Sequence, residues 1–178
     1  MKIFKYALLA IPFLYFSCSD DDDTPELPND EEVITTMNVY VDGVLAMSST
    51  DLDGDGPDEP VVTEGSLLSN TTYQVRLEFL NELENPAEDI TEEIEEESDE
   101  HQVFFSSTIA GVEFEYTNFD NQDPPLPLGT TFNLITGDSG TGTITITLIH
   151  EPIKPNTGLD SAGGSEDISV TFDVSVSI

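Results

Sequence analysis

Apolar and polar residues alternate along much of this chain, which is the pattern of half-buried β-strands. The stretch TYQVRLEF (72–79) places alternate residues from Tyr73 to Phe79 on one apolar face. TITITLIH (143–150) and ISVTFDVSVSI (168–178) show the same period of two. One buried and one solvated face is typical of strands in antiparallel sheets. We expect further strands at 33–41, 44–49, 101–109, 112–118 and 130–136.

Stretches rich in Gly, Pro, Asp and Asn separate these strands, for example DGDGPDEP, NQDPPLPLG and KPNTGLDSAGG. About eight strands with short polar connections predict a mainly β fold, an antiparallel β-sandwich of immunoglobulin-like architecture. One short acidic helix is expected at 87–100, with Pro86 near its first turn. Its Ile90 and Ile94 would pack against the sandwich.

The N-terminal segment has the features of a secretory signal peptide. Lys2 and Lys5 precede the apolar stretch ALLAIPFLYF, which is too short to span a bilayer. Cys18, the only cysteine, follows the small residue Ser17 and is the expected lipidation site. The expected organisation is a signal peptide at 1–17, a lipidated cysteine and acidic flexible tether at 18–32, and a β-sandwich domain at 33–178.

An acidic run directly follows the cysteine. Pro, Asp, Glu and Asn bury too little apolar area to order such a segment, so a solvated tether is one interpretation. The other is an export signal, because this run resembles the signal that sends Bacteroidota lipoproteins to the cell surface. That signal would comprise Ser19, Asp20, Asp21, Asp22 and Asp23. We therefore expect a protein that is lipid-anchored in the outer membrane and exposed at the cell surface.

The net charge of the chain limits the classes of partner that we expect it to bind. It has 37 acidic and 4 basic residues, and its formal net charge at pH 7 is −33. Such a charge repels nucleic-acid phosphates and anionic lipid headgroups. Nucleic acid is therefore not an expected partner, and cations or basic protein surfaces are.

The most acidic stretch, ITEEIEEESDEH, ends in His101, one of two histidines. At about 100° per residue, Glu97 and His101 lie near each other on one face if the helix reaches residue 101. Histidine and carboxylates suit zinc, iron or manganese, so we predict a divalent-metal site formed by Glu93, Glu97, His101 and His150. The alternative is a solvated acidic helix whose negative C-terminal end favours His101.

The second histidine, His150, lies in LIHEP at the end of a predicted strand. If His101 and His150 meet in space, two imidazoles and several carboxylates make a credible metal site. Two histidines can also hold a haem iron from both faces, so a haem carrier is a minor alternative.

A second candidate cation site lies in DLDGDGPDE. It places Asp51, Asp53, Asp55 and Asp58 in the spacing of the first half of an EF-hand-type calcium loop. Val62 occupies the position of the bidentate glutamate of such loops, and no helix is expected beside it. Weak calcium binding is one interpretation, and a surface turn shaped by Asp and Gly is the other.

Enzymatic function is not expected. GDSG (137–140) matches a serine-protease motif, but Gly and Ser are needed for a turn there, and no nucleophile-and-base pair is evident.

The short pattern DSA resembles the acceptor of Bacteroidota O-glycosylation and makes Ser161 a candidate modification site.

Three segments carry a wider resemblance: DLDGDGPDEPVVTEGSLLSNTTYQVRLEFLNE, PAEDITEEIEEESDEHQVFF and GTGTITITLIHEP. In them the chain resembles a family of small flavobacterial outer-membrane lipoproteins, often labelled "type 1 periplasmic binding fold superfamily protein". The fold of that label alternates strands and helices over about twice this length, and this chain shows no such alternation. The resemblance implies a companion of an outer-membrane uptake receptor, of the TonB-dependent kind.

Together these features predict non-enzymatic binding of a divalent metal cation in support of receptor-mediated uptake. The alternative is a structural or protein-interaction module of the outer membrane. In that case calcium stiffens the loop around Asp51 and Asp58, and the acidic surface docks a basic partner.

Overall fold

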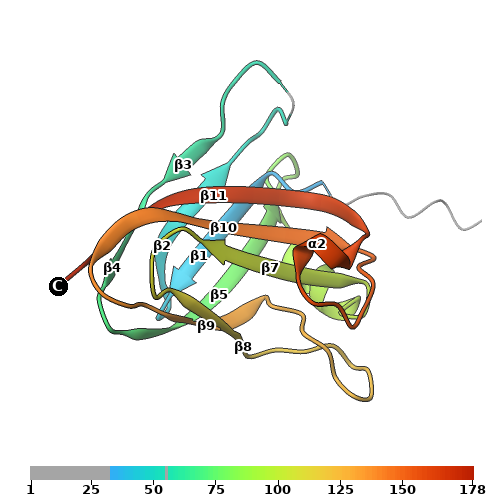
Figure 1. The fold of residues 1–178 in the computed structure, drawn as a ribbon. Helices are drawn as coiled ribbons and strands as arrows, with labels where there is room; N and C mark the ends of the chain where they lie inside the picture. The colour runs from blue at the N-terminus through green and yellow to red at the C-terminus, as the bar shows by residue number, and fades with distance from the viewer. Residues whose placement is uncertain (1–32, 55) are drawn as a thin grey trace, which may run out of the picture. The chain divides into compact units, whose positions relative to one another are not determined.

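The computed structural model describes residues 33–54 and 56–178, whose strands form two sheets (Figure 1). The larger sheet has seven strands in the order β3-β2-β1-β5-β9-β8, with β6 paired to β5 outside this path. The smaller sheet has four strands in the order β4-β11-β10-β7. The predicted mainly β fold is confirmed.

The strand bounds follow the alternation of apolar and polar residues. The larger sheet contains β1 (Thr36–Val41), β2 (Val44–Thr50), β3 (Val61–Thr63), β5 (Thr72–Asn81), β6 (Glu88–Asp89), β8 (Glu113–Tyr116) and β9 (Thr131–Ile135). The smaller sheet contains β4 (Gly65–Leu68), β7 (His101–Ser107), β10 (Gly140–His150) and β11 (Ser165–Ser177). Within the described strands all ladders are antiparallel except that of β4 with β11, which is parallel.

The two sheets share one apolar core. Leu77 and Phe79 of β5 and Ile146 and Phe172 of the smaller sheet are each 0% exposed and belong to the same buried cluster. Because alternate side chains of a strand point to opposite faces, each sheet contributes one apolar face to this core. The arrangement is a β-sandwich, as the period-two pattern predicted.

A two-residue turn joins β1 to β2. Asp42 and Gly43 have φ angles of 50° and 80°. Positive φ at both central residues is the conformation of a type I′ turn, whose twist matches that of the strands it joins. The sequence Asp-Gly suits it because glycine adopts positive φ at little cost and aspartate tolerates it.

The acidic helix is shorter than predicted. Helix α1 spans Ile90–Glu96, and Asp89 caps it by accepting a hydrogen bond from the Thr91 N–H. The expected span of 87–100 was wrong at both ends, because the Asp89 cap fixes the start and residue 101 already pairs in β7. Ile90 and Ile94 are buried against the core, as predicted.

Other boundaries also differ from the prediction. Strand β11 begins at Ser165 rather than at 168, and a second short helix, α2 (Leu159–Ala162), lies within a segment that we expected to be a loop. The short strands β3, β4 and β6 were not predicted. All three residues of β3 are exposed, so its sequence carries no alternation that would reveal it. Within the described residues there is no helix of the length and apolar character needed to cross a membrane.

Candidate metal centre

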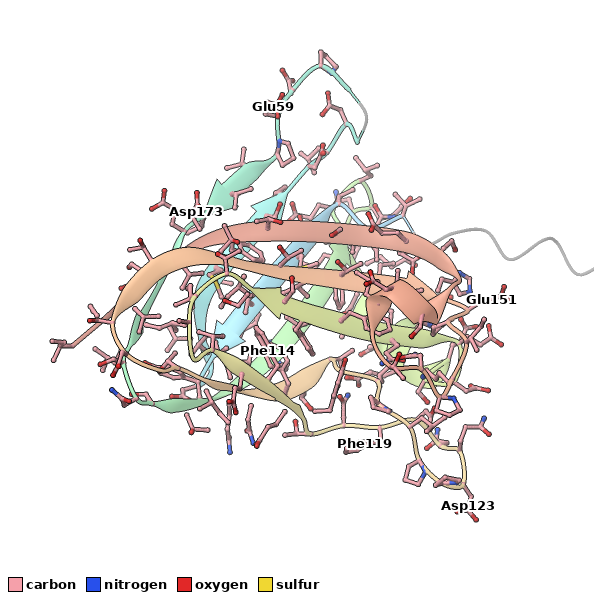
Figure 2. The ribbon with its side chains drawn as sticks, viewed as in Figure 1. Glu59, Phe114, Phe119, Asp123, Glu151 and Asp173 are labelled. Carbon is pink, nitrogen blue, oxygen red and sulfur yellow. The ribbon has the colours of Figure 1, made fainter. Side chains whose placement is uncertain are left out.

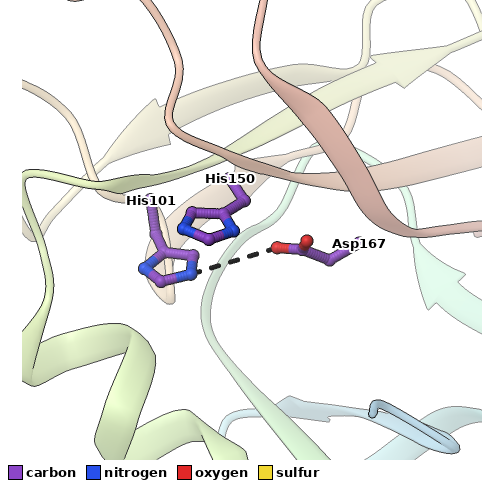
Figure 3. A group of neighbouring side chains, drawn as sticks. All are labelled: His101, His150 and Asp167. Carbon is purple, nitrogen blue, oxygen red and sulfur yellow. Dashed lines mark ion pairs between the residues drawn. The ribbon is translucent and has the colours of Figure 1, made fainter. Parts of the chain in front are cut away.

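The two histidines face each other at the end of the ladder between β7 and β10. His101 is the first residue of β7, His150 is the last residue of β10, and the register pairs them directly. Directly opposed residues share a face of the sheet. The imidazole rings consequently stack, with their centroids 4.8 Å apart and their planes at 12° (Figure 3).

Both rings lie on the inner face of the smaller sheet. His150 continues the buried series of Ile146 and Leu148, and His101 is followed at period two by buried Val103. His101 is 0% exposed and His150 is 4% exposed. The pair therefore extends the core of the sandwich at one end, where helix α1 packs.

The end of helix α1 sets the protonation of His101. Nδ1 of His101 lies 3.2 Å from the carbonyl oxygen of Glu97, the C-cap residue of the helix. Because a carbonyl only accepts, Nδ1 donates the proton to this oxygen, which also accepts the backbone N–H of Glu100 at 2.8 Å. The solvated-helix alternative expected the negative C-terminal end of the helix to favour His101, and this contact lies at that end, although the ring is buried.

Burial favours the neutral form of the His101 ring. Burial lowers the pKa of His101; the hydrogen bond to Glu97 opposes this, and the nearby His150 and Lys154 add to it. In a neutral ring protonated on Nδ1, Nε2 carries a lone pair. Within the described part of the chain, Nε2 of His101 makes no hydrogen bond.

A β-bulge brings a carboxylate to this lone pair. Leu148 of β10 pairs with Ile168 of β11, but the next residue, Ile149, pairs with Glu166. Asp167 is therefore an extra residue on β11. Bulges bend a strand and change the direction of its side chains.

The bulge turns Asp167 inward. Along β11 the even-numbered residues Val170 and Phe172 are buried, so uninterrupted alternation would place Asp167 on the outer face. Instead its side chain is 0% exposed, and Oδ2 lies 4.0 Å from Nε2 of His101 (Figure 3). Sequence reasoning missed this residue because nothing in the local pattern marks the bulge.

These three residues could hold a metal ion. One ligand atom from each of His101, His150 and Asp167 can be chosen so that all lie within 4.8 Å of one another. Zinc bonds of about 2.0–2.1 Å in a tetrahedron require ligand atoms about 3.3 Å apart, so binding would draw atoms that are up to 4.8 Å apart together by up to about 1.5 Å. Two imidazoles and one carboxylate suit zinc, iron(II) or manganese, and a water would complete the coordination.

The structure does not bring the other two predicted ligands into this group. Because α1 ends at Glu96, His101 does not continue its helical face. Glu93 is exposed, and neither Glu93 nor Glu97 belongs to a group of potential ligands within the described residues. Glu97 instead contributes its backbone carbonyl, which accepts the hydrogen bond from Nδ1 of His101. Burial raises the pKa of its side chain, as do the charges of Glu100 and Glu93.

A buried lysine holds the loops around this end of the sandwich. Nζ of Lys154 donates to the carbonyl of Ser98 at 2.8 Å and to Oδ2 of Asp120 at 3.3 Å. The Lys154 and Asp120 side chains are only 6% and 0% exposed. Burial lowers the pKa of Lys154, and Asp120 raises it. The pair connects the segment after α1 to those after β8 and β10.

In the acidic loop between β2 and β3, the carboxylates accept hydrogen bonds from backbone N–H groups of the loop itself. Oδ1 of Asp51 accepts the N–H groups of Asp53 and Gly54, and Oδ2 of Asp53 accepts the N–H of Asp58. Such bonds shape a turn. No group of potential ligands includes these residues among those that the structure describes, and Asp55 lies outside them. Figure 2 shows Glu59 on this loop, which projects from the sandwich.

Two further predictions concern modification. Ser161 lies in α2 and is exposed, and its hydroxyl donates to the carbonyl of Gly158 and accepts from the N–H of Thr157. Cys18 and the run from Ser19 to Asp23, together with the signal peptide, lie outside the described residues.

Comparisons add no relative. No family model, no curated protein and no solved structure matches this chain.

Proposed function

We propose that this protein binds a divalent transition-metal ion, without catalysing a reaction, through His101, His150 and Asp167. Zinc, iron(II) or manganese suits these ligands. The His101 lone pair carries the proposal: the Glu97 carbonyl holds the proton on Nδ1, while Nε2 is buried 4.0 Å from an Asp167 carboxylate oxygen. A metal ligand commonly has its other ring nitrogen bonded to a backbone carbonyl in this way.

Isothermal titration of the purified protein with Zn²⁺, Fe²⁺, Mn²⁺ and Ca²⁺ tests the proposal. We expect at least one transition metal to bind more tightly than about 1 μM. Asp167→Asn preserves the shape of the side chain but removes its charge, and His101→Ala removes a ligand. Both variants should weaken binding at least about tenfold.

Glu93→Gln is the matched control, because it removes a charge of the nearby acidic run without touching the three ligands. It should bind as the wild type does. The proposal is wrong if the wild type binds none of the transition metals, or if Glu93→Gln loses as much affinity as Asp167→Asn.

The cellular setting is proposed from the N-terminal sequence. Lipidation at Cys18 would anchor the protein in the outer membrane, and the acidic run after it would direct export to the surface, beside a TonB-dependent receptor that takes up the metal. A Cys18→Ser variant should leave the membrane fraction. Replacing Asp20, Asp21, Asp22 and Asp23 by alanine should protect the anchored protein from protease added to intact cells.

The burial of the ligands favours a second candidate function. An ion held by fully buried side chains suits a structural role, so the domain could be an interaction module whose metal fixes one end of the sandwich. In that version the ion remains bound when a receptor is present. In the uptake version the receptor removes it.

The immunoglobulin-like arrangement of the strands stays a prediction.

The stacked rings argue against the haem alternative. Two axial histidines approach a haem iron from opposite faces of the macrocycle. The rings of His101 and His150 instead lie face to face, with centroids 4.8 Å apart.

A further inference from the structure

A second group of potential ligands adjoins the buried one. One ligand atom from each of Glu100, His150 and Glu151 can be chosen so that all lie within 4.8 Å of one another. His150 belongs to both groups. His150 is therefore close both to the buried residues His101 and Asp167 and to the two exposed glutamates.

Backbone contacts hold this outer group at the end of the β7–β10 ladder. Glu100 precedes His101 and Glu151 follows His150, so both glutamates flank the last pair of the β7–β10 ladder. The N–H of Glu151 donates to the carbonyl of Glu100 at 2.6 Å, which holds the two chain segments together. Figure 2 shows Glu151 at the end of the sandwich where α2 lies.

The outer group is more accessible to ions from solvent than the buried group is. The Glu100 side chain is 48% exposed, and its Oε2 lies 4.0 Å from Nε2 of His150, whose side chain is 5% exposed. By contrast, the side chains of His101 and Asp167 are 0% exposed. Among the described residues, His150 is the ligand that the exposed group and the buried group share.

The surrounding negative charge favours a cation at this end of the ladder. Asp99, Glu100 and Glu151 are exposed and lie within two residues of the paired histidines, so their negative charges repel one another at this end of the ladder. The opposing charge of a metal ion would relieve that repulsion.

We propose that Glu100, His150 and Glu151 form an outer subsite that captures a divalent metal ion and passes it through His150 to His101 and Asp167. This inference rests on the proposed function. In the transfer, the ion would exchange the two carboxylates for Nε2 of His101 and a carboxylate oxygen of Asp167, keeping His150 as the ligand common to both groups and a water that completes the coordination.

The test measures rates of binding rather than affinity alone. Stopped-flow absorbance follows Co²⁺, whose visible spectrum reports its coordination, as it binds to the wild type and to the double variant Glu100→Gln/Glu151→Gln. The buried ligands are unchanged in this variant. We expect its association and dissociation rates to fall together by about tenfold, so that the affinity changes little.

The matched control removes the same charge from exposed positions of helix α1. Glu92→Gln/Glu96→Gln should keep both rates within about twofold of the wild type, because general attraction of cations changes little. Equal slowing in both double variants would mean that only overall charge matters and would overturn the outer subsite, as would unchanged rates in Glu100→Gln/Glu151→Gln. If the wild type binds no Co²⁺, this inference fails, and the proposed function fails with it if Zn²⁺, Fe²⁺ and Mn²⁺ do not bind either.

Discussion

At the residue scale, one glycine makes the close approach of β10 and β11 possible beside the site. Gly164 has a φ of 75° and immediately precedes β11. A Cβ there would collide with the carbonyl oxygen of His150 and crowd a side-chain methyl of Ile149. Any larger residue would therefore push on the backbone that positions His150 and, three residues later, Asp167.

Gly164→Ala should thus destabilise the protein more than an equally strained substitution elsewhere. The matched control is Gly43→Ala, whose φ of 80° is similar but whose Cβ would meet no heavy atom within 4 Å among the described residues. We expect about 1 kcal/mol from strain in the control and about 1–3 kcal/mol more in Gly164→Ala. Urea unfolding measures both, and equal losses would contradict the steric argument.

At the element scale, one threonine connects helix α1 to strand β5. The hydroxyl of Thr91 accepts the N–H of Phe79 at 2.9 Å and lies 3.3 Å from the carbonyl of Phe79, to which it donates. Both residues are buried. The side chain replaces a neighbouring strand at this point of β5, which fixes where the acidic helix packs.

Thr91→Val keeps the shape of the side chain but leaves the buried Phe79 N–H without its acceptor. We expect a loss of about 1–3 kcal/mol in the free energy of unfolding. Thr91→Ser retains the hydroxyl and should lose less, since only a methyl group is removed. Denaturant unfolding of the three proteins decides this, and a Val variant as stable as the Ser variant would show that the hydroxyl does not connect the two elements.

Connections between elements are held by the buried pair of Lys154 and Asp120. Burial raises the pKa of Asp120, but N–H groups of Leu126 and Gln122 and the ammonium of Lys154 outweigh it, so the pKa lies below its ordinary value. A carboxyl whose pKa is lower in the folded state stabilises that state when ionised. The contribution is complete above the unfolded pKa of about 4 and is lost as pH falls through the folded one.

Asp120→Asn should therefore destabilise the protein at pH 7, by about 3 kcal/mol, because Lys154 loses its buried partner. The difference from the wild type should shrink below about pH 4. Asp123→Asn is the control, an exposed carboxylate of the same connection that Figure 2 shows on its loop. Thermal unfolding at several pH values measures this, and a difference that does not depend on pH would exclude the ion pair as its cause.

At the scale of the whole molecule, charge repulsion is the dominant electrostatic feature. A formal net charge of −33 raises the free energy of the compact state, since folding brings like charges closer together. Dissolved salt screens this repulsion over distances that shorten as its concentration rises. The acidic surface therefore makes stability depend on ionic strength.

The melting temperature should rise when NaCl is increased from roughly 0.01 M to 0.15 M. CaCl₂ at the same ionic strength should add nothing further if the carboxylates of Asp51 and Asp53 only shape a turn. A larger rise with calcium, lost in Asp51→Asn, would instead support the predicted calcium loop. A melting temperature that falls with NaCl would contradict the repulsion argument itself.

Much of the fold was predictable because its strands are half-buried. Phe79, Ile146 and Phe172 lie in the core where alternation placed them. The same alternation extended by one step puts His150 on the inner face after Leu148, so its burial could have been inferred. The pairing of His150 with His101 could not, because it depends on the register between β10 and β7.

The sequence by itself determined which residues point inward along the regularly alternating parts of the longer strands, the strongly acidic charge, and the residue types from which a cation site could be made. These are local properties that a short stretch of chain carries. Only the tertiary structure decided which of them meet. The register stacked His101 on His150, the early end of α1 excluded Glu93, and a one-residue bulge turned Asp167 into the core. Each depends on hydrogen bonds between segments far apart in the chain, and no single segment records them.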